Sequence, residues 1–201
     1  GLNLCNGFGG LVGGNFASLS PQRTPLIQNC SSSCVIAAGN SFNFLGGLVG
    51  MNFNSDIIDC YASGMITTED FCENIGGLVG YSVGYSPARI TGCYSNTFIT
   101  ADSGSYGLGG FVGTNNLDSD VVDCYFLESS GPNNGHATPY TNKQLKRKEN
   151  FPGWSFYSFS NPDIEAIWRM CRDGIHYPKF NWEFNTQADL KCPDGVDLTD
   201  F

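Results

Sequence analysis

The sequence predicts an all-β protein: a short β-solenoid (β-helix) of about four coils, followed by an aromatic-rich C-terminal cap that contains one short helix. Three observations support this prediction. One glycine motif occurs four times, its copies begin at positions 9, 46, 76 and 109, and no stretch repeats apolar residues at helical spacing over three turns. A period of 30 to 37 residues is typical of stacked supersecondary units, and the many glycine and β-branched residues favour strands over helix pairs.

The glycine motif consists of a glycine pair, two apolar residues and a third glycine. Stacked coils bring equivalent residues to about 4.8 Å from one another, so we expect the leucines and the phenylalanine in one interior column and the valines in a column on the other side of their strand. The glycines allow a positive φ at a corner and a close approach of neighbouring coils. The repeated positions are Gly9, Gly10, Leu11, Val12 and Gly13; Gly46, Gly47, Leu48, Val49 and Gly50; Gly76, Gly77, Leu78, Val79 and Gly80; and Gly109, Gly110, Phe111, Val112 and Gly113.

A second landmark follows each glycine motif, an aliphatic residue three positions before a cysteine. Two such residues lie on opposite faces of a regular strand, so a bend is required if both are buried. We interpret the aligned cysteines as a column of reduced thiols packed as small apolar groups. Disulfides between neighbouring coils are the alternative, because stacked Cα atoms lie within disulfide range. The pairs are Ile27 with Cys30, Ile57 with Cys60, Ile90 with Cys93 and Val121 with Cys124, and the last three cysteines are followed by Tyr61, Tyr94 and Tyr125.

These two landmarks resemble the GLUG repeat, named for its Gly-Leu-hydrophobic-Gly core. That repeat is found in secreted and surface-anchored proteins, including bacterial adhesin-like proteins and IgA-cleaving metallopeptidases, so the resemblance implies an extracellular scaffold. The peptidase activity does not transfer, because His-Glu-x-x-His is absent. The chain departs from the family in its nine cysteines and in a longer segment between Phe156 and Ile167. The similarity continues to residue 182 through Thr141, Gln144, Leu145, Phe151, Gly153, Trp154, Phe156, Ile167, Trp168, Tyr177, Pro178 and Trp182.

Composition agrees with a protein of the cell exterior. The chain has 26 glycines and only 14% charged residues, and it has no run of 18 apolar residues that would span a membrane. Its nine cysteines favour an oxidising compartment, and their odd number leaves at least one without an intrachain partner. The chain begins at Gly1 without a leader, which we interpret as a mature or trimmed product. We therefore expect an extracellular or cell-surface location.

Three segments are expected along the chain: GLUG-type repeats over residues 1–130, a capping segment over 131–184 and an acidic tail over 185–201. In the first coil, the prolines between Ser18 and Pro25 predict a loop. The capping segment begins with a loop and continues with the short helix, for which Thr141 and Gln144 have capping-box spacing before Glu149.

The aromatic residues of the capping segment have two possible roles. We expect them to cover the open end of the last coil, because aromatic side chains cover the most area per residue. A sugar-stacking platform is the alternative for Trp154, Trp168 and Trp182. Cys171 and Cys192 are the predicted intrachain disulfide, which would tie the tail to this segment.

Two parts of the sequence suggest modification or metal binding. Asn29 precedes Cys30 and Ser31 in the acceptor pattern for N-glycosylation, which requires a eukaryotic source and an exposed side chain. Aspartates before the cysteines suggest calcium, but Arg89, Thr91 and Gly92 interrupt their columns, so solvated outer-face aspartates are favoured. Two histidines and no Cys-x-x-Cys make zinc improbable. No metal or cofactor is predicted; the aspartates concerned are Asp56, Asp59, Asp118, Asp120 and Asp123.

Charge is distributed unevenly. Through residue 142 there are two basic residues and ten acidic ones, whereas from residue 143 onward there are eight and nine. A net charge of −9 without a basic stripe makes nucleic acid a poor partner. No aromatic lid precedes the first glycine motif, so we expect an uncovered β edge on the first coil that pairs with another chain segment or another copy. A head-to-tail contact would give a filament, favoured by an acidic body and the basic residues Lys143, Lys146, Arg147 and Lys148.

Two functional classes remain. The first is a non-catalytic extracellular structural or adhesive protein, which a head-to-tail contact would make one subunit of a filament, with glycans or cell-surface material as further partners. The alternative is a polysaccharide-binding or polysaccharide-cleaving β-helix protein, which would need clustered carboxylates or a base beside them. The aspartates lack a nearby basic residue in their own coil, and neither Gly-x-Ser-x-Gly nor a phosphate-binding loop is present. We therefore predict no catalytic residue and favour the first class.

Overall fold

The computed structural model describes residues 7–17, 25–84, 89–116, 120–158 and 165–184. The chain divides into two compact units, residues 1–141 and 142–201. Among the described residues, no helix has the length and apolarity that a membrane span requires.

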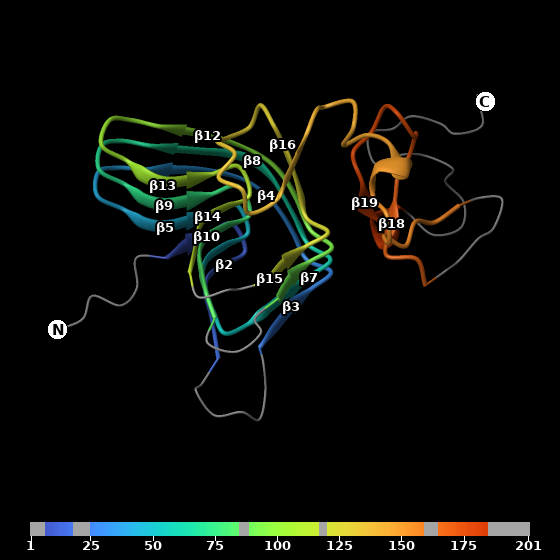
Figure 1. Cartoon of the computed structure of the whole chain (residues 1–201), viewed down its shortest axis with the longest axis horizontal. Helices are drawn as coiled ribbons and strands as arrows, with labels where there is room; N and C mark the ends of the chain where they lie inside the picture. The colour runs from blue at the N-terminus through green and yellow to red at the C-terminus, as the bar shows by residue number, and fades with distance from the viewer. Residues whose placement is uncertain (1–6, 18–24, 85–88, 117–119, 159–164, 185–201) are drawn as a thin grey trace. The chain divides into compact units, whose positions relative to one another are not determined.

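Unit one is a β-solenoid, as predicted: four parallel sheets, each built from one strand of every coil (Figure 1). Sheet A stacks β1 (Phe8–Gly9), β5 (Asn43–Gly46), β9 (Glu73–Gly76) and β13 (Tyr106–Gly109). Sheet B stacks β2 (Val12–Phe16), β6 (Val49–Phe53), β10 (Val79–Val83) and β14 (Val112–Asn116). Sheet C stacks β3 (Leu26–Gln28), β7 (Asp56–Ile58), β11 (Arg89–Thr91) and β15 (Asp120–Val122). Sheet D stacks β4 (Ser31–Ala38), β8 (Tyr61–Thr68), β12 (Tyr94–Ala101), β16 (Tyr125–Leu127) and β17 (Thr138–Tyr140).

The strand register stacks like with like. Val12 pairs with Val49, which pairs with Val79 and then with Val112, and Tyr61 pairs with Tyr94 and then with Tyr125. Equivalent glycines therefore recur once per turn, and about three turns separate Gly9 from Gly109. Residues at equivalent positions of the sequence repeat are therefore the residues that pair between neighbouring coils.

The motif glycines are required by close backbone approach. A Cβ on Gly80 would lie 2.6 Å from the backbone nitrogen of Leu45, and one on Gly46 would lie 2.8 Å from the nitrogen of Gly80. Real Cβ atoms essentially never come this close to backbone atoms. None of the motif glycines has a positive φ, so the expected left-handed corner is not the reason for them. Sheets A and B instead pack backbone against backbone.

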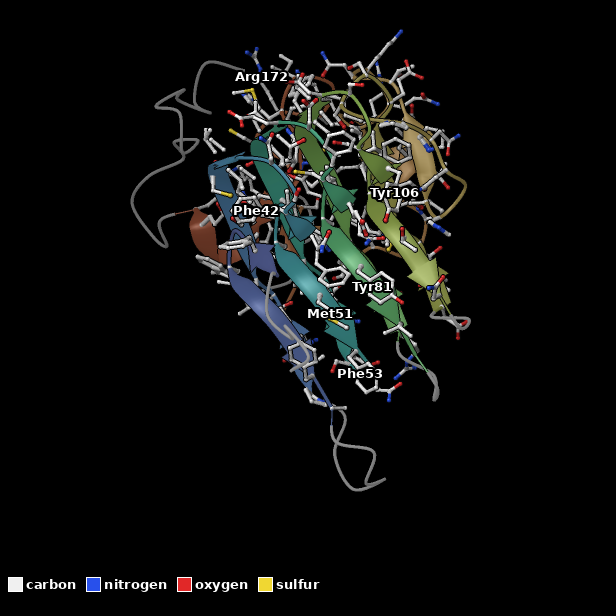
Figure 2. The ribbon with its side chains drawn as sticks, turned by 90° about the vertical axis from the view of Figure 1, so that its left-hand side faces the viewer. Phe42, Met51, Phe53, Tyr81, Tyr106 and Arg172 are labelled. Atoms are coloured by element: carbon white, nitrogen blue, oxygen red, sulfur yellow. The ribbon has the colours of Figure 1, made fainter. Side chains whose placement is uncertain are left out.

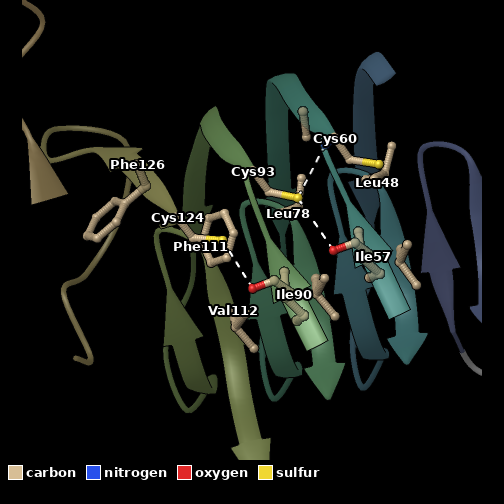
Figure 3. Close-up of a cluster of buried hydrophobic side chains, with 13 residues drawn as sticks. Leu48, Ile57, Cys60, Leu78, Ile90, Cys93, Phe111, Val112, Cys124 and Phe126 are labelled. Atoms are coloured by element: carbon tan, nitrogen blue, oxygen red, sulfur yellow. Dashed lines mark hydrogen bonds between the residues drawn. The ribbon is translucent and has the colours of Figure 1, made fainter. Parts of the chain in front are cut away.

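The core lies inside the coils and consists of buried apolar side chains (Figure 3). Leu48 and Val49 are both fully buried in one cluster, whereas the valines were expected on the other side of their strand. The reason is a corner: Leu48 precedes the strand, and the amides of Leu48 and Val49 both donate to the carbonyl of Leu78, at 2.9 and 3.0 Å. Adjacent residues therefore both face inward. The cluster contains Leu48, Val49, Ile57, Cys60, Ala62, Leu78, Val79, Ile90, Cys93, Phe111, Val112, Cys124 and Phe126.

The bend required before each cysteine is a single left-handed residue. Asp59 has φ 50° and Asp123 has φ 51°, and Gly92 occupies the same position with φ 65°. Asp, Asn and Gly adopt this conformation at the lowest cost among the common residues. One such residue turns the chain from sheet C to sheet D, so Ile57 and Cys60 both point into the core.

Unit two is irregular around a small antiparallel pair, β18 (Trp168–Arg169) and β19 (Lys179–Phe180). In place of the helix expected over 141–149 it has turns through residues 142–146 and the 3-10 helix η1 (Lys148–Asn150); a second 3-10 helix, η2, spans Asn181–Glu183. Leu145 is the one fully buried side chain between residues 141 and 150, so no apolar stripe stabilises an α-helix there.

Candidate interaction surfaces

The cysteine column is a packing element and not a reactive site. Cys60, Cys93 and Cys124 are buried free thiols, so the reduced-thiol interpretation is confirmed over disulfides between neighbouring coils (Figure 3). The Cys60 amide donates to Cys93 Sγ at 3.3 Å, and the Cys93 thiol donates to the Thr91 carbonyl at 3.2 Å. Burial raises the pKa of Cys93, and the hydrogen bond with Cys93 together with burial raises the pKa of Cys60. Both thiols therefore stay protonated and poor nucleophiles.

The aspartates near the cysteines have structural partners. Asp56 Oδ1 accepts the Arg89 amide at 2.9 Å, and its other oxygen lies 3.7 Å from the Arg89 guanidinium. Asp59 and Asp123 are the left-handed turn residues. Within the described ranges, no three His, Cys, Asp or Glu side chains are grouped to hold a metal ion.

A polar ladder that the sequence reasoning missed runs inside sheet B. The Asn15 amide donates to Asn52 Oδ1 at 3.0 Å, and the Asn52 amide donates to the Ser55 carbonyl at 2.8 Å. Asn52 is fully buried, so these bonds satisfy polar groups that water cannot reach. The signal was present in the sequence, because Asn or Ser stands two residues after the third motif glycine in every coil.

The first coil presents an open edge. β1, β2, β3 and β4 each stand last in their sheets, so in the described structure their outer backbone groups have no strand beside them. Leu11 is 46% exposed, whereas Leu48 and Leu78 at the same motif position are 0% exposed. The end of the stack therefore offers both unpaired backbone and apolar side chains.

The last coil, by contrast, is covered by residues 128–140. The Asn134 side chain donates to the carbonyls of Val112 at 2.7 Å, Gly113 at 2.9 Å and Leu108 at 3.3 Å, and the Gly110 amide donates to the Pro132 carbonyl at 2.8 Å. These bonds occupy the outer edges of β13 and β14. Whether residues 142–184 add to this cover, as expected for the capping segment, stays a prediction.

The two remaining strands of that end carry residues that oppose further pairing. β17 pairs with β16 and contains Pro139, which has no amide hydrogen to donate. β15 begins with Asp120 and is followed by Asp123, both exposed. Proline and charge are the usual protections of an edge strand. The strand edges of the last coil are thus protected against further pairing, whereas those of the first coil lack this protection in the described structure.

Aromatic side chains gather on the outer face of sheets A and B, which we name the aromatic face (Figure 2). Tyr106 is 56% exposed, and its hydrogen bond with Glu73 raises the pKa of the phenol. The Phe44 and Tyr81 rings lie 5.2 Å apart, and Asn116 donates to the Tyr81 hydroxyl at 2.9 Å. Rings beside amide and carboxylate groups are a suitable surface for sugars.

Unit two has its own aromatic stack. Trp154 lies 4.4 Å from Trp168, Trp168 lies 4.9 Å from Phe180, and Phe180 lies 5.3 Å from Trp182, all between ring centroids. Trp168 is fully buried and Trp182 is 64% exposed. Of the three tryptophans weighed as a sugar platform, Trp182 therefore presents the widest free surface.

The predicted modification sites remain predictions. Asn29 is exposed, with a left-handed φ of 53°, so its side chain is accessible. Cys171 is buried, and Cys192 lies outside the described residues, so their disulfide is a prediction too. The acidic tail over 185–201 also lies outside them.

Parallel strands stacked in register around a closed core define the protein as a β-solenoid. A family model described as "The GLUG motif" matches residues 45–67 and 71–97. These segments run from β5 into β8 and from just before β9 into β12, so the second and third coils carry the GLUG motif, which is consistent with a GLUG-repeat family. No curated protein and no solved structure matches the chain.

Proposed function

We propose that the chain is a non-catalytic structural or adhesive protein of the cell exterior, which associates with other molecules through its first coil. The observation that carries the proposal is the difference between the two ends of the solenoid. One end is covered by Asn134 and β17, whereas at the other end the described residues place no strand beside β1, β2, β3 and β4 and leave Leu11 46% exposed. An unprotected edge of this kind serves association.

Rigidity supports the structural role. Cysteine, tyrosine and asparagine columns run from coil to coil, and the ring centroids of Tyr61 and Tyr94 stack at 5.1 Å. Such ladders fix the register of a sheet, as cross-strand pairs do. Buried protonated thiols also tolerate an oxidising exterior, because the thiolate is the form that reacts.

The test is a binding and turnover assay on one preparation. Fluorescent protein is incubated with intact cells, extracellular matrix and insoluble polysaccharides, bound protein is measured after washing, and the supernatant is assayed for new reducing ends. We expect retention on at least one surface without release of sugar. Soluble oligosaccharide appearing over time would refute the non-catalytic assignment, and failure to adhere to any of these surfaces would refute the structural or adhesive one.

A second candidate, polysaccharide binding, is favoured by the aromatic face. Tyr81 and Tyr106 lie on neighbouring sheets with hydrogen-bonding groups beside them. Binding to a glycan array should weaken at least about fivefold on Tyr106→Ala, since a ring contact contributes about 1 kcal/mol or more. Phe98→Ala is the control, because Phe98 is 47% exposed but lies on sheet D. Equal loss in both variants would exclude the aromatic face.

A further inference from the structure

The outer edge of β4 is the longest open edge of the first coil. β4 pairs with β8 over its whole length, from Ser31 opposite Tyr61 to Ala38 opposite Thr68. The Tyr61 amide donates to the Cys30 carbonyl and the Glu69 amide to the Ala38 carbonyl, both at 3.1 Å. Because backbone groups alternate along a strand, even-numbered residues face β8 and odd-numbered ones face outward. The outward amides and carbonyls belong to Ser31, Ser33, Val35 and Ala37.

This edge has none of the usual protections. β4 contains no charged residue and no proline, and its Val35 side chain is 70% exposed. The other first-coil edges are shorter: β1 has two residues, β3 has three and β2 has five. A long, uncharged edge with β-branched residues is a template for pairing with another strand.

We propose that β4 pairs antiparallel with β4 of a second copy, about a twofold axis at Cys34. This inference rests on the proposed function, and it names a second copy of the chain as the first molecule that the first coil binds. In that register Val35 forms a hydrogen-bonded pair with Ser33 of the second copy, and Ser31 pairs with Ala37. All four outward residues are then satisfied, and sheet D continues from one copy into the other, as in strand-addition complexes.

Because the last coil is covered, this assembly stops at two copies. A head-to-tail filament needs an open edge at both ends, and the last coil offers Asn134, Pro139 and Asp120 instead. Pairing through β4 uses the longest open edge of each copy and places both first coils at the interface, so neither copy offers a free first coil to a third. It also places no charged residue of β4 against its second copy, because β4 is uncharged. The structure therefore favours a dimer over the filament expected from charge distribution.

Cys34 provides a direct probe of the register. Cys34 is a free, half-buried thiol, 3.8 Å from the Gly47 carbonyl. The backbone amide and carbonyl of Cys34 face β8. At the twofold axis Cys34 therefore forms a non-hydrogen-bonded pair with Cys34 of the second copy, with Cα atoms about 4.5 Å apart. That distance is within the range of a disulfide. Diamide, which accepts the two electrons and two protons released, should join two Cys34 thiols into one disulfide.

The equilibrium test is sedimentation velocity over a concentration series. The wild-type protein should form dimers, and Val35→Lys should weaken them at least about tenfold, because it places two ammonium groups close together across the axis. Met65→Lys is the matched control: Met65 occupies the same outward column one coil further in and is 40% exposed. Val35→Pro should also weaken dimers, since the amide hydrogen that it removes makes no hydrogen bond to β8.

Three results would overturn the proposal: a monomer at about 100 μM, equal effects of the two lysine substitutions, or polymers longer than a dimer.

The covalent test uses non-reducing gels after diamide treatment. The dimer band should disappear in Cys34→Ser and persist in Cys30→Ser, since Cys30 is a half-buried free thiol of the same coil. A band that survives Cys34→Ser would refute the register. A monomer that still adheres to cells or polysaccharide would refute this inference and leave the proposed function standing, and a dimer that adheres to nothing would do the reverse.

Discussion

Replacement of Leu78 by alanine gives the sharpest measure of the stacked core. Leu78 is fully buried in the cluster that also contains Leu48 and Phe111, the residues at the same motif position in the coils on either side. Removing its side chain leaves a cavity that the backbone contacts around Gly77 and Gly80 cannot collapse. We therefore expect a loss of about 3 to 4 kcal/mol in the free energy of unfolding.

Leu11→Ala is the matched control, because the same motif position is 46% exposed in the first coil. It loses part of the transfer free energy and creates no closed cavity, so the cost should be about 1 kcal/mol or less. Urea unfolding followed by far-UV circular dichroism, at concentrations low enough to keep the protein monomeric, measures both. Equal losses for the two variants would refute the like-with-like stack and the open first coil together.

Three further predictions concern the motif, the covered end and the thiols. Gly47→Ala should unfold the protein or cost about 3 kcal/mol, because a Cβ there meets backbone of the next coil; Gly39→Ala, whose Cβ has no neighbour nearer than 3.8 Å, should be close to neutral in the same urea assay. Asn134→Ala should cost about 2 kcal/mol through three lost hydrogen bonds and should speed amide hydrogen exchange in the last coil before the others; unchanged exchange would argue against its covering role. The pKa of Cys93 is raised in the folded state, so the folded protein holds this proton more tightly than the unfolded chain. The contribution of the Cys93 thiol to stability should therefore be constant below about pH 8.5 and fall by at most about 1.4 kcal/mol per pH unit above it, and Cys93→Ala should reduce the slope of stability against pH in that range.

Much of the fold could be predicted because the chain repeats itself. Two landmarks in fixed order define the period, and the period defines which residues stack, so the columns through Leu48 and Cys60 follow from the sequence. What the repeat does not define is the local path. Leu48 and Val49 both face the core because the chain turns a corner between them, and pattern counting on a straight strand assigns them to opposite sides.

The surfaces were harder to predict, because they depend on residues outside the repeat. The position of β1 to β4 at one end of their sheets follows from the order of the repeats, but the cover of the last coil depends on Asn134, whose loop has no counterpart in the other coils. The prediction of a short helix over residues 141–149 was wrong in the type of structure, because turns and a 3-10 helix stand there. Capping-box spacing marks where a helix can begin, and Leu145 alone gives it no apolar face to bury.

The asparagine ladder has a consequence for how such a protein changes length. Each coil supplies one amide or hydroxyl at that position and meets only its two neighbours, so a whole coil can be lost or duplicated without orphaning the rest. Removing residues 46–75 would place Ser82 beside Asn15, one hydrogen-bonding group against another. The solenoid can therefore lengthen or shorten in steps of one period without any change to the residues of its first and last coils.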